Sequence, residues 1–191
     1  MTFPSKAARS DSIKPLLRPD ERLLWQGQPN LRAYSLRGSW YLIPFSLMWG
    51  GFAIMWEVGV VVSGAPPLFV LWGIPFVAVG IYMIFGRIPL ARREAKRTLY
   101  AVTDRRVIIV TGSLGQRLVE IALTDLPPTQ LEVRGVSLGT ITFGVTMGAF
   151  RAPPGWPTMG MYAQAPAFTL IPDAARVYQI LQDAKAAARR S

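Results

Sequence analysis

The fold is decided by two apolar runs, WYLIPFSLMWGGFAIMWEVGVVV (residues 40–62) and PLFVLWGIPFVAVGIYMIFG (residues 67–86). Each reaches the length of about 20 predominantly apolar residues with which a helix crosses the hydrocarbon core of a bilayer. Their one ionisable residue is Glu57, and the residues between them, SGAP, carry no charge. So short a connection allows only a tight reversal. The sequence therefore predicts a transmembrane helical hairpin over residues 40–86.

Basic residues flank this hairpin on both sides, and membrane proteins keep such residues on the cytoplasmic side. The flanking residues are Lys14, Arg18, Arg22, Arg32 and Arg37 before the first run, and Arg87, Arg92, Arg93, Lys96 and Arg97 after the second. Both termini are thus expected in the cytoplasm. A cleaved signal peptide is not expected, because the first run starts near residue 40 and is followed at once by another.

The basic residues after the second run lie in the linker RIPLARREAKR, residues 87–97. As a helix, this linker would present cations to the phosphates of an anionic leaflet. A plain stop-transfer charge cluster explains the same residues equally well. The candidate lipid-phosphate contacts are Arg87, Arg92, Arg93, Lys96 and Arg97. Because the membrane accounts for the formal charge of +10, no nucleic-acid partner is expected.

Short runs rich in β-branched residues follow the linker, and they predict strands. They span residues 99–103, 106–112, 117–123, 129–134, 139–145 and 167–171. The early connectors are too short for parallel pairing, so the strands are expected to be antiparallel. The segment DAARVYQILQDAKAAARR, residues 173–190, shows helical periodicity at Val177, Ile180, Leu181 and Ala184 after a candidate N-cap, Asp173. Residues 98–188 are therefore expected to form an α+β domain of six to seven strands, covered by one C-terminal helix.

The residues ahead of the hairpin divide into two parts. Residues 1–16 are expected to be flexible, because they are polar and show no periodicity. Residues 17–39 contain Leu23, Leu24 and Trp25, which are too apolar for a free arm. This second part is expected to dock on the domain or on the membrane surface.

Three motifs then show a resemblance. They are LRPDERLLWQGQP (residues 17–29), YAVTDRRVIIVTG (residues 100–112) and FTLIPDAARVYQIL (residues 168–181). In this order around two apolar spans, they resemble bacterial membrane proteins with a pleckstrin-homology-like (PH-like) domain. The resemblance implies an antiparallel β-barrel or sandwich capped by a C-terminal helix, held at the bacterial cytoplasmic membrane.

One feature departs from the PH domains that bind phosphoinositides, which use a basic, irregular loop between their first two strands. Here that connector is only Thr103-Asp104-Arg105-Arg106. It is too short to form a headgroup pocket. Asp104 is instead expected to set the turn by bonding to its own backbone.

Catalytic signatures are missing from the sequence. It contains no cysteine and no histidine, which removes thiolate nucleophiles, imidazole bases and the usual zinc ligands. No nucleophile elbow and no phosphate-binding glycine loop occurs. The acidic residues of the domain are scattered singly. We therefore expect a protein that is not an enzyme and holds neither a cofactor nor a metal.

A binding module at the membrane fits these constraints, acting as an accessory, assembly or interaction factor for another membrane protein or through self-association. Its candidate contact is the segment GWPTMGMY, residues 155–162, because exposed loops often carry binding residues. The residues concerned are Trp156, Met159, Met161 and Tyr162. The same loop could instead fold back over the sheet, and the two readings are equally weighted.

Two alternatives stay open. An oligomeric transporter or channel would use Glu57, since ionisable groups within membrane spans often mark ion or proton paths. The structural interpretation of Glu57 is favoured, because it lies near the outer end of its span, where it can reach water. The other alternative is a peripheral module that senses lipid headgroups.

Overall fold

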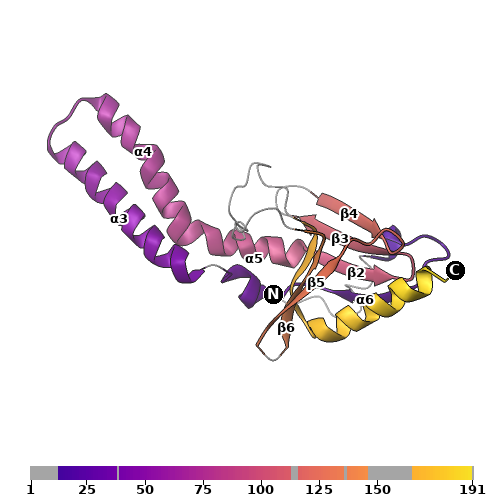
Figure 1. Cartoon of the computed structure of the whole chain (residues 1–191). Helices are drawn as coiled ribbons and strands as arrows, with labels where there is room; N and C mark the ends of the chain where they lie inside the picture. Colours follow the sequence, from indigo (N-terminus) through magenta and orange to yellow (C-terminus); the bar gives the residue numbers. More distant parts are fainter. Residues whose placement is uncertain (1–12, 38, 113–115, 136, 146–164, 191) are drawn as a thin grey trace, which may run out of the picture.

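The computed structural model describes residues 13–37, 39–112, 116–135, 137–145 and 165–190. A long helical hairpin projects from a β-rich domain (Figure 1). A short 3-10 helix, η1 (Lys14–Leu16), begins the described chain.

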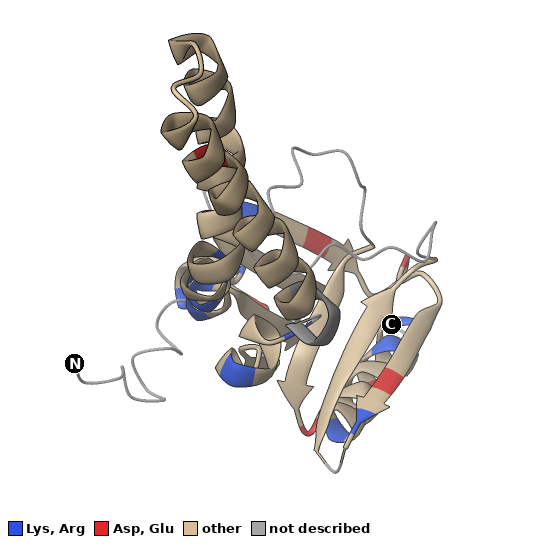
Figure 2. Cartoon of the chain, turned by 90° about the vertical axis from the view of Figure 1, so that its left-hand side faces the viewer, with Lys and Arg blue, Asp and Glu red and all other residues tan. Residues whose placement is uncertain are grey.

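The hairpin consists of α3 (Ser39–Val62) and α4 (Pro67–Ile81). A π-helical turn, η2 (Tyr82–Gly86), continues α4 into α5 (Arg87–Arg97). The runs Ile43–Val62 and Pro67–Arg97 are each long and apolar enough to cross a membrane. Their large apolar side chains face outward, and Figure 2 shows almost no charge along the hairpin. By length and composition, both helices of the hairpin could therefore span a membrane.

Small residues bring the two helices together. A Cβ atom at Gly80 would lie 2.8 Å from Cα of Gly50. A second close contact follows on the same side of the two helices. The carboxylate of Glu57, seven residues after Gly50, lies against Gly73, seven residues before Gly80. Ala53, between the two α3 positions, is buried. These positions form one packing seam, in which small residues permit a close approach of the two helices.

The first sheet has four antiparallel strands in the order β1-β2-β3-β4. Its strands are β1 (Leu23–Gly27), β2 (Leu99–Thr103), β3 (Arg106–Gly112) and β4 (Gln116–Ala122). Strand β1 lies before the hairpin and pairs with β2 after it, aligning Leu23 with Thr103 and Gly27 with Tyr100. The hairpin, with the short helix α2 (Leu31–Ser35) leading to it, is thus inserted between two neighbouring strands. The sheet includes a strand from residues 17–39, outside the range 98–188 expected for the domain.

The second sheet has three antiparallel strands in the order β5-β6-β7. They are β5 (Thr129–Arg134), β6 (Leu138–Phe143) and β7 (Ala167–Pro172), and α6 (Ala174–Ala188) follows. The six expected strands and the C-terminal helix are confirmed. Within the described residues the two sheets do not join into a closed barrel, so the barrel form of the expected fold is not found. We call the seven strands and α6 the β domain.

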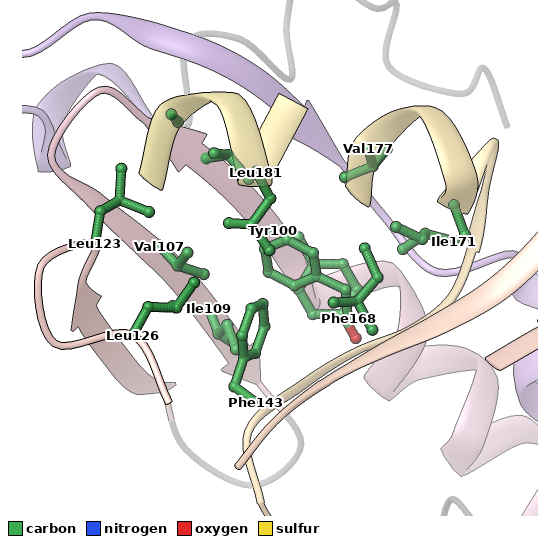
Figure 3. Close-up of a cluster of buried hydrophobic side chains, with 14 residues drawn as sticks. Tyr100, Val107, Ile109, Leu123, Leu126, Phe143, Phe168, Ile171, Val177 and Leu181 are labelled. Atoms are coloured by element: carbon green, nitrogen blue, oxygen red, sulfur yellow. The ribbon is translucent and has the colours of Figure 1, made fainter. Parts of the chain in front are cut away.

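Phe168 stands at the centre of the core of the β domain (Figure 3). Its ring centroid lies 4.9 Å from that of Tyr100, 5.1 Å from that of Phe143 and 5.5 Å from that of Trp25. Leu181 of α6 is fully buried against this group. Each such side chain contributes on the order of 2 kcal/mol by leaving water. The core therefore joins both sheets, α6 and the N-terminal strand.

Asp173 holds the N-cap position of α6, but its side chain makes no capping hydrogen bond. Its backbone is left-handed, with φ of +52°. The backbone N–H of Asp173 donates to the carbonyl of Ser137 at 2.7 Å. Asp173 is therefore the N-cap residue that the sequence predicts, but its backbone N–H, and not its side chain, ties the start of α6 to the chain entering β6.

Candidate functional site

An ion-pair cluster around Arg106 fastens the N-terminal segment to the first sheet. Nε and Nη2 of Arg106 donate to the two carboxylate oxygens of Glu21 at 2.9 and 2.8 Å. Nη2 also donates to the carbonyl of Leu16 at 2.8 Å, and Nη1 pairs with Glu120 on β4. The side chain of Glu21 is 0% exposed and that of Arg106 is 9% exposed. A bidentate pair so shielded from water holds its two segments in one register.

The Thr-Asp-Arg-Arg turn belongs to the same cluster. Oγ1 of Thr103 donates to Glu21 at 2.7 Å and accepts the backbone N–H groups of Arg105 and Arg106. The sequence predicts that Asp104 bonds to its own backbone in this turn, and this prediction is wrong. Its carboxylate accepts the backbone N–H of Arg22 at 3.0 Å. Thr103 therefore shapes the turn, while Asp104 holds the N-terminal segment.

The electrostatics of Glu21 reflect this setting. Desolvation by burial acts to raise the pKa of Glu21, but hydrogen bonds from Arg106, the Arg18 backbone and Thr103 outweigh it and lower the pKa to about 2. Hydrogen bonding to Glu21 raises the pKa of Arg106. Glu21 is thus held ionised as part of the fold, and its proton is not poised for acid–base chemistry near neutral pH.

The glycine of the Trp-Gln-Gly stretch in β1 is required for a steric reason. A Cβ atom at Gly27 would lie 2.4 Å from the Trp25 ring. With no side chain at Gly27, the ring can lie over this position and pack against Phe168 in the core. The residues just ahead of the hairpin are therefore part of the β domain.

Helices α2 and α5 form the junction between hairpin and β domain. The hydroxyl of Tyr34 on α2 donates to Glu94 on α5 at 3.0 Å. Burial, and then the neighbouring Glu94 charge, raise the pKa of Tyr34. Asn30 caps α2 by accepting the Ala33 N–H at 3.0 Å, and its own N–H donates to Leu170 of β7 at 2.9 Å. Both chain connections of the hairpin are thereby bound to each other and to the domain.

The five expected lipid contacts lie on α5, but the structure separates them. Arg87 is buried at the start of the helix, and the other four side chains are exposed. Among these, Arg92 and Lys96 line a groove of about 570 Å³ between α5 and α2, whose other lining residues are Leu31, Arg32 and Leu36. Arg93 and Arg97 do not line it. Figure 2 shows Lys and Arg gathered where the hairpin meets the domain.

Of the two other expected sites, only Glu57 lies within the described residues. The candidate partner residues Trp156, Met159, Met161 and Tyr162 lie outside the described residues. Glu57 lies within its own hairpin, directed at Gly73. Its buried Oε2 atom has no hydrogen-bond partner. Among the described residues, no group of three His, Cys, Asp or Glu side chains is arranged to hold a metal ion.

Sequence reasoning missed two features of this region. It did not pair Glu21 with Arg106, which are 85 residues apart, although both lie in the motifs quoted for the resemblance. The sequence shows Arg32 only as a charge flanking the hairpin, and it does not show that Arg32 lies in one groove with Arg92 and Lys96. A usable signal was the pair of acidic residues, Asp20 and Glu21, in one motif and the pair of arginines, Arg105 and Arg106, in the other.

Comparison with known families gives one match. A family model described as Bacterial PH domain matches residues 53–185, which is more than half of the chain. The matched range runs from within α3 to within α6, so β1 and Glu21 precede it. No curated protein and no solved structure matches the chain.

Proposed function

Because this chain belongs to the bacterial PH domain family, we propose that it is a non-enzymatic membrane protein that presents its PH-like domain as a binding module. The module would serve as an accessory, assembly or interaction factor for another membrane protein. The hairpin would span the cytoplasmic membrane, with the β domain and both termini on the inner side. Family membership alone does not confer a role, so the proposal rests on the geometry of the junction.

The observation that carries the proposal is the insertion of the hairpin between β1 and β2. A domain attached by one linker can turn freely, whereas this one is connected through both α2 and α5. The Tyr34–Glu94 hydrogen bond joins these connections at 3.0 Å, and Gln28 donates to the carbonyl of Lys96 at 3.4 Å. Such a domain would be held at one distance from the membrane and in one orientation, which favours contact with another protein in the same membrane.

The described surface offers a contact for such a neighbour. Strand β5 is an edge of the second sheet, and its Val133 side chain is 58% exposed. An exposed edge strand presents unpaired backbone groups to which another chain can add a strand. The hairpin offers a second surface, since Trp72 on α4 is 71% exposed. The position of Glu57 inside its own hairpin gives less support to a transporter, which would need it in a shared interior.

The topology can be tested with single cysteines, because the chain contains none. Ser63 at the tip of the hairpin and Ser137 in the β domain are both exposed. We expect a membrane-impermeant maleimide to label Ser63→Cys in cells whose cytoplasmic membrane is intact and whose outer layers are permeable. Ser137→Cys should be labelled only after that membrane is opened. Equal labelling of the two variants in intact cells would contradict the proposed topology.

The partner can be tested with photo-crosslinking amino acids at Val133 and Trp72. We expect at least one of these positions to give a discrete crosslink to one membrane protein, which also copurifies in a fixed ratio in mild detergent. A probe at Arg189, exposed near the end of α6, serves as the control and should give no discrete product. Recovery of the chain without crosslinks from both test positions would argue against the proposal.

A further inference from the structure

We propose that the groove between α2 and α5 binds the phosphate headgroup of an anionic phospholipid. We call it the junction groove, and its lining residues are Leu31, Arg32, Leu36, Arg92 and Lys96. Its volume is about 570 Å³, which is in the range of small-molecule sites. This inference rests on the proposed function, because it needs the hairpin to lie in a membrane.

The charges of the junction groove are all positive. Arg32 comes from α2, while Arg92 and Lys96 stand one helical turn apart on α5. All three side chains are exposed, and none forms a salt bridge within the described part of the chain. The nearest acidic residue on α5, Glu94, does not line the groove and accepts a hydrogen bond from Tyr34. Two guanidinium groups and an ammonium group are thus available to a phosphate, which they bind by charge-assisted hydrogen bonds.

The apolar part of the junction groove distinguishes a lipid from a free anion. Leu36 is 42% exposed and Leu31 is partly exposed, both beside the cations. Helix α3 begins at Ser39, only a few residues after Leu36, and α5 follows α4 through the π-helical turn η2. The groove therefore lies at the foot of the hairpin, at the depth where headgroups meet acyl chains if the hairpin spans. A phospholipid offers a phosphate to the cations and glycerol and acyl carbons to the leucines.

The walls of the junction groove are set before any ligand binds. Ala91 and Ala95 of α5 are fully buried, which fixes the rotation of the helix about its axis. Arg92 and Lys96, which follow these alanines in the sequence, are left exposed. The Tyr34–Glu94 hydrogen bond holds α2 against α5, and the Asn30 side chain fixes the start of α2 by accepting the Ala33 N–H. A site whose two helices are already fixed loses little backbone freedom on binding.

The test uses the full chain in nanodiscs of phosphatidylcholine with a small fraction of phosphatidylglycerol, and native mass spectrometry counts the retained anionic lipid. The groove variant is Arg92→Gln/Lys96→Gln. The comparison variant, Arg93→Gln/Arg97→Gln, removes the same charge at the same spacing from the same helix but outside the groove. We expect phosphatidylglycerol affinity to fall about tenfold or more in the groove variant and about twofold in the comparison variant. Arg32→Gln should give a loss of several-fold.

Equal losses in both double variants, or no loss in either, would overturn the junction groove as a site. Displacement of the lipid by millimolar glycerol phosphate would also overturn the lipid assignment, because it would show a site for a soluble anion. The Ser63→Cys and Ser137→Cys labelling, repeated in each variant, separates this inference from the proposed function. Correct labelling with equal lipid losses rejects only the groove, whereas failed labelling of Ser63→Cys in the chain without groove substitutions rejects the topology itself.

Discussion

Replacing Arg106 with Met is expected to lower the free energy of unfolding of the β domain by about 3–5 kcal/mol, the usual cost of breaking a buried ion pair from one side. The substitution leaves the fully buried Glu21 carboxylate without its guanidinium. It also removes the hydrogen bond to the Leu16 carbonyl and the pairing with Glu120. The N-terminal segment should then detach from the turn between β2 and β3. Urea unfolding of the full chain in detergent micelles, followed by near-UV circular dichroism, measures the change.

Two variants make this result specific. Arg105→Met changes the exposed neighbour of Arg106 in the same turn and should alter stability by no more than about 0.5 kcal/mol. Glu21→Met/Arg106→Met removes both charges, so it should recover much of the loss, since no charge is left buried. If Arg106→Met and Arg105→Met proved equally stable, the ion pair would not hold the segment.

The same cluster predicts an acid sensitivity. The pKa of Glu21 is about 2 in the folded chain, against an ordinary value of 4.5. Because the folded value is the lower one, the stabilisation is complete above about pH 4.5 and is lost as the pH falls toward about 2. The difference corresponds to about 3 kcal/mol. Glu21→Gln should therefore lose less stability than the unmodified chain over this interval in the same urea measurement. Parallel curves for the two proteins would contradict the role of Glu21.

Local patterns were enough to locate the strands and the last helix. Residues 99–103 and 106–112 are rich in β-branched side chains and joined by a short polar turn. Their pairing can therefore be predicted from adjacent sequence alone. Strand β1 could not be found in this way. Its partner β2 lies beyond the whole hairpin, and a run of five residues carries no information about a neighbour so distant in sequence. Only the apolar character of Leu23 and Trp25 indicated that this segment docks somewhere.

In the candidate site, too, contacts between residues distant in sequence could not be predicted. The cations on α5 were visible as a cluster, because they are adjacent in sequence. Which of them share a groove depends on the rotation of α5, fixed by the burial of Ala91 and Ala95, and on the placement of α2 beside it. The role assigned to Asp104 was wrong for a related reason. A local rule predicts a bond to its own backbone, whereas Thr103 already satisfies that turn and Asp104 is left to bind Arg22.

Replacing Gly80 with Leu is expected to separate the two hairpin helices at their base. A Cβ atom at this position would lie 2.8 Å from Cα of Gly50, and backbone cannot move aside as a flexible side chain can. Overpacking of a fitted contact costs about 1–3 kcal/mol, and a leucine adds three further carbon atoms to the clash. Gly51→Leu is the matched control. No atom lies within 4 Å of a Cβ atom at Gly51, so its side chain would extend into open space.

The separation can be measured with cysteines at Trp49 on α3 and Phe76 on α4, whose ring centroids are 6.4 Å apart. In the otherwise cysteine-free chain, a short thiol-specific crosslinker should join this pair efficiently in membranes. We expect Gly80→Leu to lower the crosslinking yield severalfold and Gly51→Leu to leave it unchanged. Because α3 and α4 lead into α2 and α5, Gly80→Leu should also weaken lipid retention in the junction groove. Equal yields in the two leucine variants would show that the Gly50–Gly80 contact does not set the helix spacing, and would remove the basis for a rigid junction.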